Sequence, residues 1–186
     1  MKQQRLFYNI IGSKHFNALV VLDEFGTIYY ASIGNSLDQL KNQLVIDFKS
    51  SNQYQLLPYS TLKDKSLTEI TIDKFKLLLE DPSRSEKFSI KFIFGTSLQR
   101  KVWLELMKIP HGEVTTYGDI ARKLRMKPTS SRAIGGCIGA NKIAAIVPCH
   151  RVIASNKTIS GYRWGVEVKK YFLKHELGDS YDQLVN

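Results

Sequence analysis

The chain has 186 residues, of which 43% are hydrophobic and 24% charged, a composition typical of a globular protein with its own hydrophobic core. No apolar run approaches the roughly 20 residues needed to cross a bilayer. The N-terminal stretch MKQQRLFYNIIGSKHF lacks a sustained apolar core, so we expect neither a secretion signal nor a membrane partner. The two cysteines, Cys137 and Cys149, make no disulfide framework and favour a reducing, intracellular setting.

The net charge of +10 is concentrated in the second half of the chain. Residues 1–90 carry 11 lysines and arginines against 10 aspartates and glutamates, whereas residues 91–186 carry 16 against 7. A chance excess of surface lysine is one explanation. The alternative is that the second half faces a polyanion such as nucleic acid.

The first part of the chain, residues 1–87, is predicted to be a small α+β domain with an antiparallel sheet. Ser36 with Gln39, and Ser66 with Glu69, have the spacing of helix capping boxes. In chain order we expect a hairpin over residues 18–34 that turns at 23–26, helices over 36–48 and 66–80, and a polar linker over 82–87. This part has a single histidine, His15, and no cysteine, so it lacks the ligands of a zinc site.

The second part, residues 88–186, is predicted to be a mostly helical domain with a helix-turn-helix, which makes the whole chain a mixed α/β (α+β) protein. In chain order we expect a strand over residues 88–94, helices over 96–109, 116–124 and 130–141, and a buried strand over 142–147. Trp103 is expected in the core. Thr116 and Asp119 form a capping box, and the basic turn RMKP separates two short helices. Such helix pairs are common, but this one falls in the basic half, which favours contact with DNA.

The last helix of this pair carries an unusual number of glycines, Gly135, Gly136 and Gly139. Each costs up to about 1 kcal/mol relative to alanine in a helix. Glycine permits close approach of another backbone. A neighbouring helix and a nucleic-acid groove explain these residues equally well.

The stretch AAIVPCHRVIAS places a thiol, an imidazole and a guanidinium between two apolar runs. A lone buried cysteine is usually inert, and we expect this of Cys137. Cys149 differs because His150 and Arg151 follow it, and such neighbours favour the reactive thiolate. Adjacent side chains of a strand point to opposite faces, so His150 is expected to reach Cys149 through a turn or a bridging water. Glu176 is one candidate to orient the imidazole.

These residues carry a resemblance to a known family. IVPCHRVI, preceded by RAIGGCIGANK and followed by GYRWGVEVKKYFLKHE, closely resembles the O6-alkylguanine-DNA alkyltransferases, also called methylated-DNA–protein-cysteine methyltransferases. The resemblance runs from about Phe94 to Glu176. The first part of the chain matches only in length and general character.

The resemblance implies a role for each matching residue. Cys149 would take the alkyl group, His150 would act as its base through a water, Glu176 would hold the imidazole, and Asn141 would complete the network. Tyr117 would press on a phosphate and help to protonate the departing guanine, and Arg132 would fill the stack that the flipped nucleotide vacates. Further DNA- or substrate-binding residues would be Tyr162 and Arg163, which close the pocket, Lys169 beside it, the carbonyls of Cys149 and Val152, and Arg151, Thr116 and Ser130.

The function implied is DNA repair by base flipping and direct reversal of damage. The protein would rotate O6-alkylguanine, mainly O6-methylguanine and also O4-methylthymine, out of duplex DNA and transfer the alkyl group once and irreversibly to Cys149. We expect no cofactor and no metal, double-stranded DNA as the partner, and a monomer. The location would be the nucleus in a eukaryote and the cytoplasm in a prokaryote.

Three other functions would explain some of these residues. Non-enzymatic relatives bind damaged DNA but lack the reactive cysteine, which this chain has. A transcription factor would explain the helix pair and the charge, but has no need of PCHRV. A cysteine hydrolase would use Cys149 with a histidine and Asn141, but it would leave the basic half unexplained.

Two departures from the family pattern concern the geometry of the site. The stretch from Tyr117 to Arg132 is one residue longer, and its turn RMKP lacks the glycine expected there. Arg163 and Trp164 stand where some members have small residues. Bulkier groups at these positions are expected to narrow the pocket and to disfavour large alkyl adducts.

Overall fold

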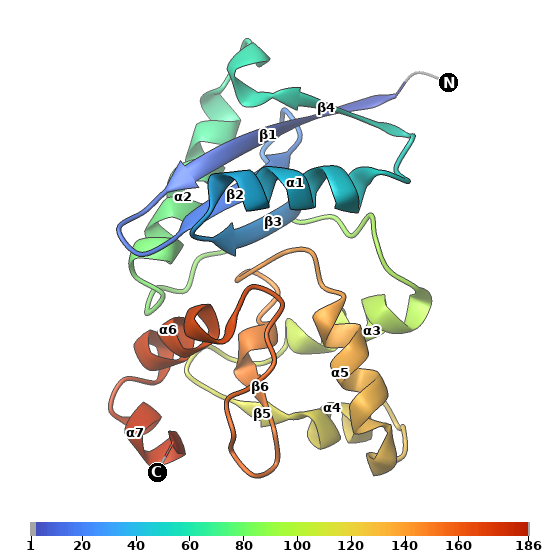
Figure 1. Ribbon diagram of the computed structural model, residues 1–186, viewed down its shortest axis with the longest axis vertical. Coiled ribbons are helices and arrows are strands. Elements are labelled where there is room, and N and C mark those ends of the chain that lie inside the picture. Colours follow the sequence, from blue (N-terminus) through green and yellow to red (C-terminus); the bar gives the residue numbers. More distant parts are fainter. Residues whose placement is uncertain (1–2, 186) are drawn as a thin grey trace. The chain divides into compact units, whose positions relative to one another are not determined.

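The computed structural model describes residues 3–185, apart from the side chain of Pro128, and its chain divides into two compact units (Figure 1). One unit consists of Met1–Asp81 with Glu86–Lys91, and the other of Pro82–Ser85 with Phe92–Asn186. The segment over 82–87 thus contributes residues to both units. A domain boundary after residue 87 stays a prediction.

The first unit is built on a four-stranded sheet of order β3-β2-β1-β4. Its strands are β1 (Gln4–Gly12), β2 (Asn17–Leu22), β3 (Ile28–Gly34) and β4 (Tyr54–Pro58). The predicted hairpin is confirmed as β2 and β3, which pair antiparallel. Asp23 closes its turn, because one carboxylate oxygen accepts the N–H groups of Phe25 and Thr27, each at 3.0 Å. The expected sheet was antiparallel throughout, but β4 pairs parallel to β1.

Two helices cover this sheet, α1 (Leu37–Phe48) in front of it in Figure 1 and α2 (Ser66–Glu80) passing behind β1. Ser36 caps α1 as predicted, since its hydroxyl accepts the Gln39 N–H. The cap predicted for α2 at Ser66 is wrong. Asp64, two residues earlier, accepts both the N–H and the hydroxyl of Ser66, because a carboxylate is the stronger acceptor.

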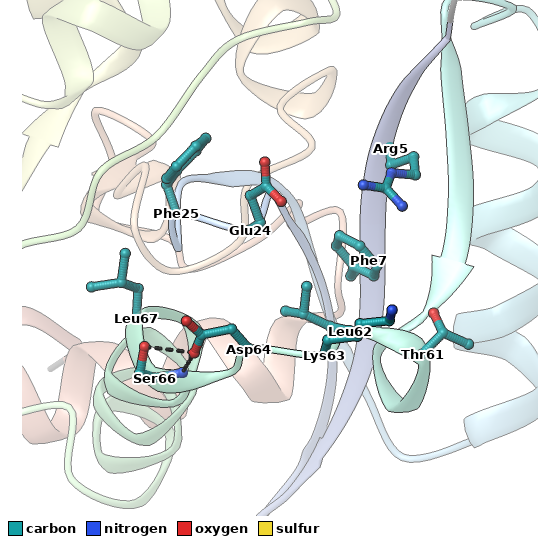
Figure 2. A pocket seen from close by; sticks show the side chains of 10 residues that line it. All are labelled: Arg5, Phe7, Glu24, Phe25, Thr61, Leu62, Lys63, Asp64, Ser66 and Leu67. Carbon is teal, nitrogen blue, oxygen red and sulfur yellow. Dashed lines mark hydrogen bonds between the residues drawn. The ribbon is translucent and has the colours of Figure 1, made fainter.

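A cavity of about 440 Å³ opens in the first unit, beside the hairpin turn and the start of α2 (Figure 2). Its lining mixes apolar and charged side chains, and contains neither cysteine nor histidine: Arg5, Phe7, Glu24, Phe25, Thr61, Leu62, Lys63, Asp64, Ser66 and Leu67. The strand predicted over 88–94 is wrong. Only Ile90 forms a bridge, to Ile28, because the chain leaves this unit after Lys91.

The second unit is mostly helical, as predicted. It contains α3 (Ser97–Leu106), α4 (Tyr117–Lys123), α5 (Ser131–Gly139), α6 (Val166–Leu177) and α7 (Ser180–Val185), with the short strands β5 (Thr115–Thr116) and β6 (Val152–Ile153). The remaining elements of the chain are single 3₁₀ turns, η1 (Tyr59–Thr61), η2 (Pro128–Ser130) and η3 (Cys149–Arg151). The capping box predicted at Thr116 is present, and Thr96 forms a second one with Gln99.

Helix α5 is the centre of this unit, because it packs against both α3 and α4. Trp103 on α3 is buried, and its indole N–H donates to the Cys137 carbonyl of α5 at 2.8 Å. Ile120 on α4 and Ile134 on α5 are fully buried. The predicted helix pair therefore forms. Its buried side chains fix the orientation of α5, and so they determine where the exposed face of α5 lies relative to the segment after the helix.

Within residues 3–185, none of the helices is long and apolar enough to cross a membrane. The same described residues contain no group of three histidine, cysteine, aspartate or glutamate side chains placed to hold a metal ion.

Candidate active site

The segment before Cys149 is a buried turn and not the strand predicted over 142–147. Ala145 has a φ of 66°, a left-handed conformation that is uncommon for a residue with a Cβ. Across it, the Ile146 N–H donates to the Ala144 carbonyl at 2.7 Å. The apolar run is buried, as expected, but its residues close a tight loop. Pro148 then leads into the 3₁₀ turn η3, so Cys149 and His150 do not point to opposite faces as they would in a strand.

The Cys149 thiol is buried and is held by Asn141. The Asn141 amide donates to Sγ at 3.4 Å, and the Asn141 Oδ1 accepts the Ile143 N–H at 2.9 Å. Burial raises the pKa of Cys149, although Asn141, Tyr162 and the charge of Lys169 pull it down. The thiol is therefore protonated at neutral pH and needs a base before it can attack.

His150 is the buried base nearest in sequence, and it pairs with Glu176 of α6. Its Nε2 lies 2.8 Å from Oε1 of Glu176, and its ring packs against Phe172. Burial lowers the pKa of His150 more than Glu176 raises it, so the imidazole is neutral. Its Nε2–H then donates to the carboxylate, which leaves Nδ1 as the basic nitrogen. Nδ1 is buried and has no hydrogen-bond partner in the described part of the chain.

Arg151 donates hydrogen bonds to Glu176 of this pair, and its contact with DNA stays a prediction. Its Nε donates to Oε2 of Glu176 at 2.8 Å, and Nη2 donates to Oε1 at 3.0 Å. A third donor, Nη1, reaches the Ile109 carbonyl at 2.8 Å. Burial raises the pKa of Glu176, but the bonds from His150 and Arg151 outweigh it and lower that pKa to about 2.

Lys169 is turned inward in this structure, and its role at the substrate stays a prediction. It is fully buried on α6, and its Nζ donates to the carbonyls of Val152 at 2.7 Å, Ser160 at 3.2 Å and Gly161 at 3.4 Å. Burial lowers the pKa of Lys169 to about 8. The Val152 carbonyl accepts from Lys169 and the Cys149 carbonyl accepts the Val152 N–H. Each carbonyl has a second lone pair, so the prediction that they read the guanine edge stays open. Lys169 therefore braces the loop that precedes α6 against η3.

A short parallel pair of strands brings the start of α4 beside the thiol. Thr115 pairs with Val152 and Thr116 with Ile153. Tyr117, the first residue of α4, then lines a cavity of about 230 Å³ together with Cys149. Burial and the neighbouring Cys149 raise the pKa of Tyr117, which keeps its hydroxyl protonated.

The same cavity is bounded by one face of α5 and by the loop before α6. Its lining residues are Tyr117, Gly135, Ile138, Gly139, Cys149, Gly161, Tyr162 and Arg163. Arg132 is exposed one turn before Gly135 on α5, on the helix face that leads to the cavity. The Tyr162 hydroxyl is buried, and burial together with the neighbouring Cys149 raises its pKa well above the ordinary value.

The glycines of α5 are explained in part by this cavity. A Cβ at Gly139 would meet nothing within 4 Å, so no neighbouring helix requires that glycine. A Cβ at Gly135 would reach the Tyr117 ring at 3.8 Å, an ordinary contact. Of the two remaining predicted contact residues, Thr116 is engaged in its capping box with Asp119, and Ser130 lies at the N-cap of α5 without a side-chain cap bond.

The helix pair and the buried, partnered thiol indicate a DNA-modifying protein that reacts through cysteine. A sequence model described as 6-O-methylguanine DNA methyltransferase, DNA binding domain, matches residues 97–178. A methylated-DNA–protein-cysteine methyltransferase of Lodderomyces elongisporus is 44% identical and covers 100% of both chains. That of Candida albicans is 46% identical over 92% of this chain and 96% of its own. Mycobacterium tuberculosis OGT in complex with DNA has the same fold, with a TM-score of 0.68 at 23% identity over 98% of this chain and 99% of its own.

The chain belongs to the methylated-DNA–protein-cysteine methyltransferases. The predicted family and the mixed α and β fold class are thereby confirmed. The structure also brings together Cys149, Asn141, His150, Glu176 and Tyr117, although the role of each stays a prediction.

Sequence reasoning missed the place of Arg151 and the lining by Gly135 and Gly139. The signal for Arg151 was its position directly after His150. In a 3₁₀ turn consecutive side chains point about 120° apart around the helix axis, so two neighbouring residues can both reach one carboxylate. The signal for the glycines was their spacing, which places Gly135 and Gly139 on one helix face.

Proposed function

We propose that this protein repairs DNA by taking the alkyl group of O6-alkylguanine onto Sγ of Cys149, once per molecule. The observation that carries the proposal is the Cys149 thiol in the 230 Å³ cavity beside α5, with Asn141 on the sulfur. DNA would be bound by the basic half of the chain, mainly through phosphates and without sequence preference. O4-methylthymine is a second substrate under the same proposal.

The reaction begins with rotation of the damaged nucleotide into the cavity, at a cost of a few kcal/mol. Arg132, exposed on α5, occupies the gap left in the base stack and offsets part of this cost. A base inside a duplex is out of reach of a buried thiol, so a rotated base is the form that can react.

The displacement itself needs a thiolate and a protonated leaving group. The thiol proton passes through one water to Nδ1 of His150, whose other nitrogen is held by Glu176. Sγ then bonds to the alkyl carbon, the carbon–O6 bond breaks, and guanine takes up a proton supplied by Tyr117. The thioether is chemically stable and nothing in the chain reverses it, so the protein acts once and needs no cofactor.

The test is the intact mass of the protein after mixing with a short duplex that contains one O6-methylguanine. The expected result is one added methyl group on the wild type and on Cys137→Ser, and none on Cys149→Ser. Tight binding of the duplex without any added mass would favour a damage-recognition protein and refute the transferase. Cleavage of an ester or amide substrate by Cys149 would favour a hydrolase.

The protein is further proposed to act as a monomer and, in a eukaryotic host, in the nucleus. Sedimentation with and without the duplex tests the first statement. Imaging of a tagged chain in its host tests the second.

A further inference from the structure

The carboxylate of Glu176 binds Arg151 as well as His150, the histidine that it orients. The Glu176 side chain is 2% exposed, and both its oxygens are engaged: Oε1 by His150 and by Nη2 of Arg151, and Oε2 by Nε of Arg151. Arg151 is itself fixed at its far side by the Ile109 carbonyl. A bidentate guanidinium of this kind sets the plane of a carboxylate as well as its position.

We propose that Arg151 is a positioning residue for the transfer: it fixes Glu176 so that His150 donates from Nε2, keeps Nδ1 free, and stays neutral. The inference rests on the proposed function, because it concerns the base that the transfer requires. It assigns to the arginine a role through the carboxylate, without contact with the substrate.

The reason is electrostatic. A buried carboxylate whose only partner is an imidazole is best compensated when the imidazole is protonated. With Arg151 in place, the carboxylate is already neutralised, and a second positive charge on His150 gains little. The charged groups that act on His150 are Glu176 and Lys169 on α6 and Arg151 beside it.

The direction of each influence on His150 agrees with this account. Burial and the charges of Arg151 and Lys169 lower the pKa of His150, and Glu176 raises it. Removal of Arg151 takes away one lowering influence and leaves the raising one. Imidazolium would then persist to higher pH, and it cannot accept the thiol proton.

The experiment compares Arg151→Met, which keeps an unbranched stem without the charge, with the wild type. Single-turnover methyl transfer is followed from pH 5.5 to 9 with protein in excess over an O6-methylguanine duplex. We expect the acid limb of the rate profile to move up by at least one pH unit, so that the rate at pH 6 falls at least tenfold more than the rate at pH 9. Arg5→Met, which removes an exposed guanidinium from β1 in the first unit and so outside the basic half, is the matched control and should keep the wild-type profile.

A second readout does not depend on transfer. Nitrogen-15 shifts of the His150 imidazole at pH 6 should report the neutral Nε2–H form in the wild type and imidazolium in Arg151→Met. If Arg151→Met loses thermal stability while neither the shifts nor the pH profile moves, the arginine is structural and the proposal is wrong. If the wild type transfers no methyl at all, the proposed function fails, and the shifts alone still decide the role of Arg151.

Arg151→Lys keeps the test open if the methionine variant does not fold. Its charge should hold His150 neutral, but one ammonium cannot span both carboxylate oxygens as the guanidinium does. The expected result is an unmoved acid limb with a rate at least tenfold lower at every pH. A wild-type rate in this variant would overturn the proposal.

Discussion

The turn between α4 and α5 stores backbone strain that a single substitution should release. Arg125 has a φ of 57°, in the left-handed region, at the position where α4 ends. Its N–H donates to the Arg122 carbonyl at 2.9 Å, and the Met126 N–H donates to the Ala121 carbonyl at 2.9 Å. This pair of bonds is the Schellman motif, in which the left-handed residue is usually glycine. The structure thus explains how RMKP turns without the glycine expected there: Arg125 takes the glycine conformation.

Arg125→Gly should therefore stabilise the protein. A left-handed conformation costs a residue with a Cβ roughly 1–2 kcal/mol. Part of this gain is lost, because glycine increases the conformational entropy of the unfolded chain and so lowers the free energy of unfolding by about 0.4–1 kcal/mol. The net gain is about 0.5–1 kcal/mol, which for a chain of this size raises Tm by about 1–4 °C.

The assay is urea unfolding of Arg125→Gly beside Arg125→Ala. Both variants lack the exposed guanidinium and so lose the same phosphate attraction, which the salt dependence of duplex binding checks. Only the glycine variant relieves the strain. Equal stability of the two variants, or a less stable glycine variant, would refute the reasoning about φ at this turn.

Three further predictions follow from the site and its surroundings. Because the pKa of Glu176 is lowered from 4.5 to about 2, its ionised form contributes about 3 kcal/mol of stability that is present above pH 4.5 and lost as the pH falls towards 2. Urea unfolding at pH 7 and pH 3 should show a smaller loss for Glu176→Gln than for the wild type, and an equal loss would contradict the coupling. Trp103→Phe leaves the buried Cys137 carbonyl without its donor and should cost about 1–3 kcal/mol in the free energy of unfolding, measured in urea. Arg163 borders the cavity, so Arg163→Ala should speed transfer of a benzyl group roughly tenfold while methyl transfer stays within about twofold, as followed by intact mass; equal gains for both groups would argue against a steric limit.

Local patterns in the sequence predicted the helices well. Ser36 and Thr116 cap their helices as expected, because a cap depends on residues three positions apart. The cap at Ser66 was wrong for a local reason too, since Asp64 offers a stronger acceptor within the same turn. The apolar residues of α1 do not all share its buried face: Leu40, Leu44 and Phe48 are buried but Val45 is 69% exposed, since helix periodicity does not define the edge of a buried stripe.

Strands were less predictable, because pairing joins residues far apart in the chain. Periodicity gave the hairpin of β2 and β3, which is local, but not β1 and β4, whose parallel pairing links Gln4 with Tyr54. The apolar runs over 88–94 and 142–147 have strand-like composition. They form isolated bridges at Ile90 and Ile143 and a buried turn after Ile143, because neither run has a partner strand to complete a ladder.

The sequence by itself indicated the family, through the motif around Cys149, and the resemblance then named His150, Asn141, Tyr117 and Glu176 as the other site residues. Which atoms meet was decided only by the tertiary structure. Glu176 is 25 residues beyond Arg151, and only the packing of α6 against η3 places both its oxygens on that guanidinium. The tertiary structure also decides that the Lys169 side chain points inward, because three backbone carbonyls meet at its Nζ only when the loop before α6 has folded.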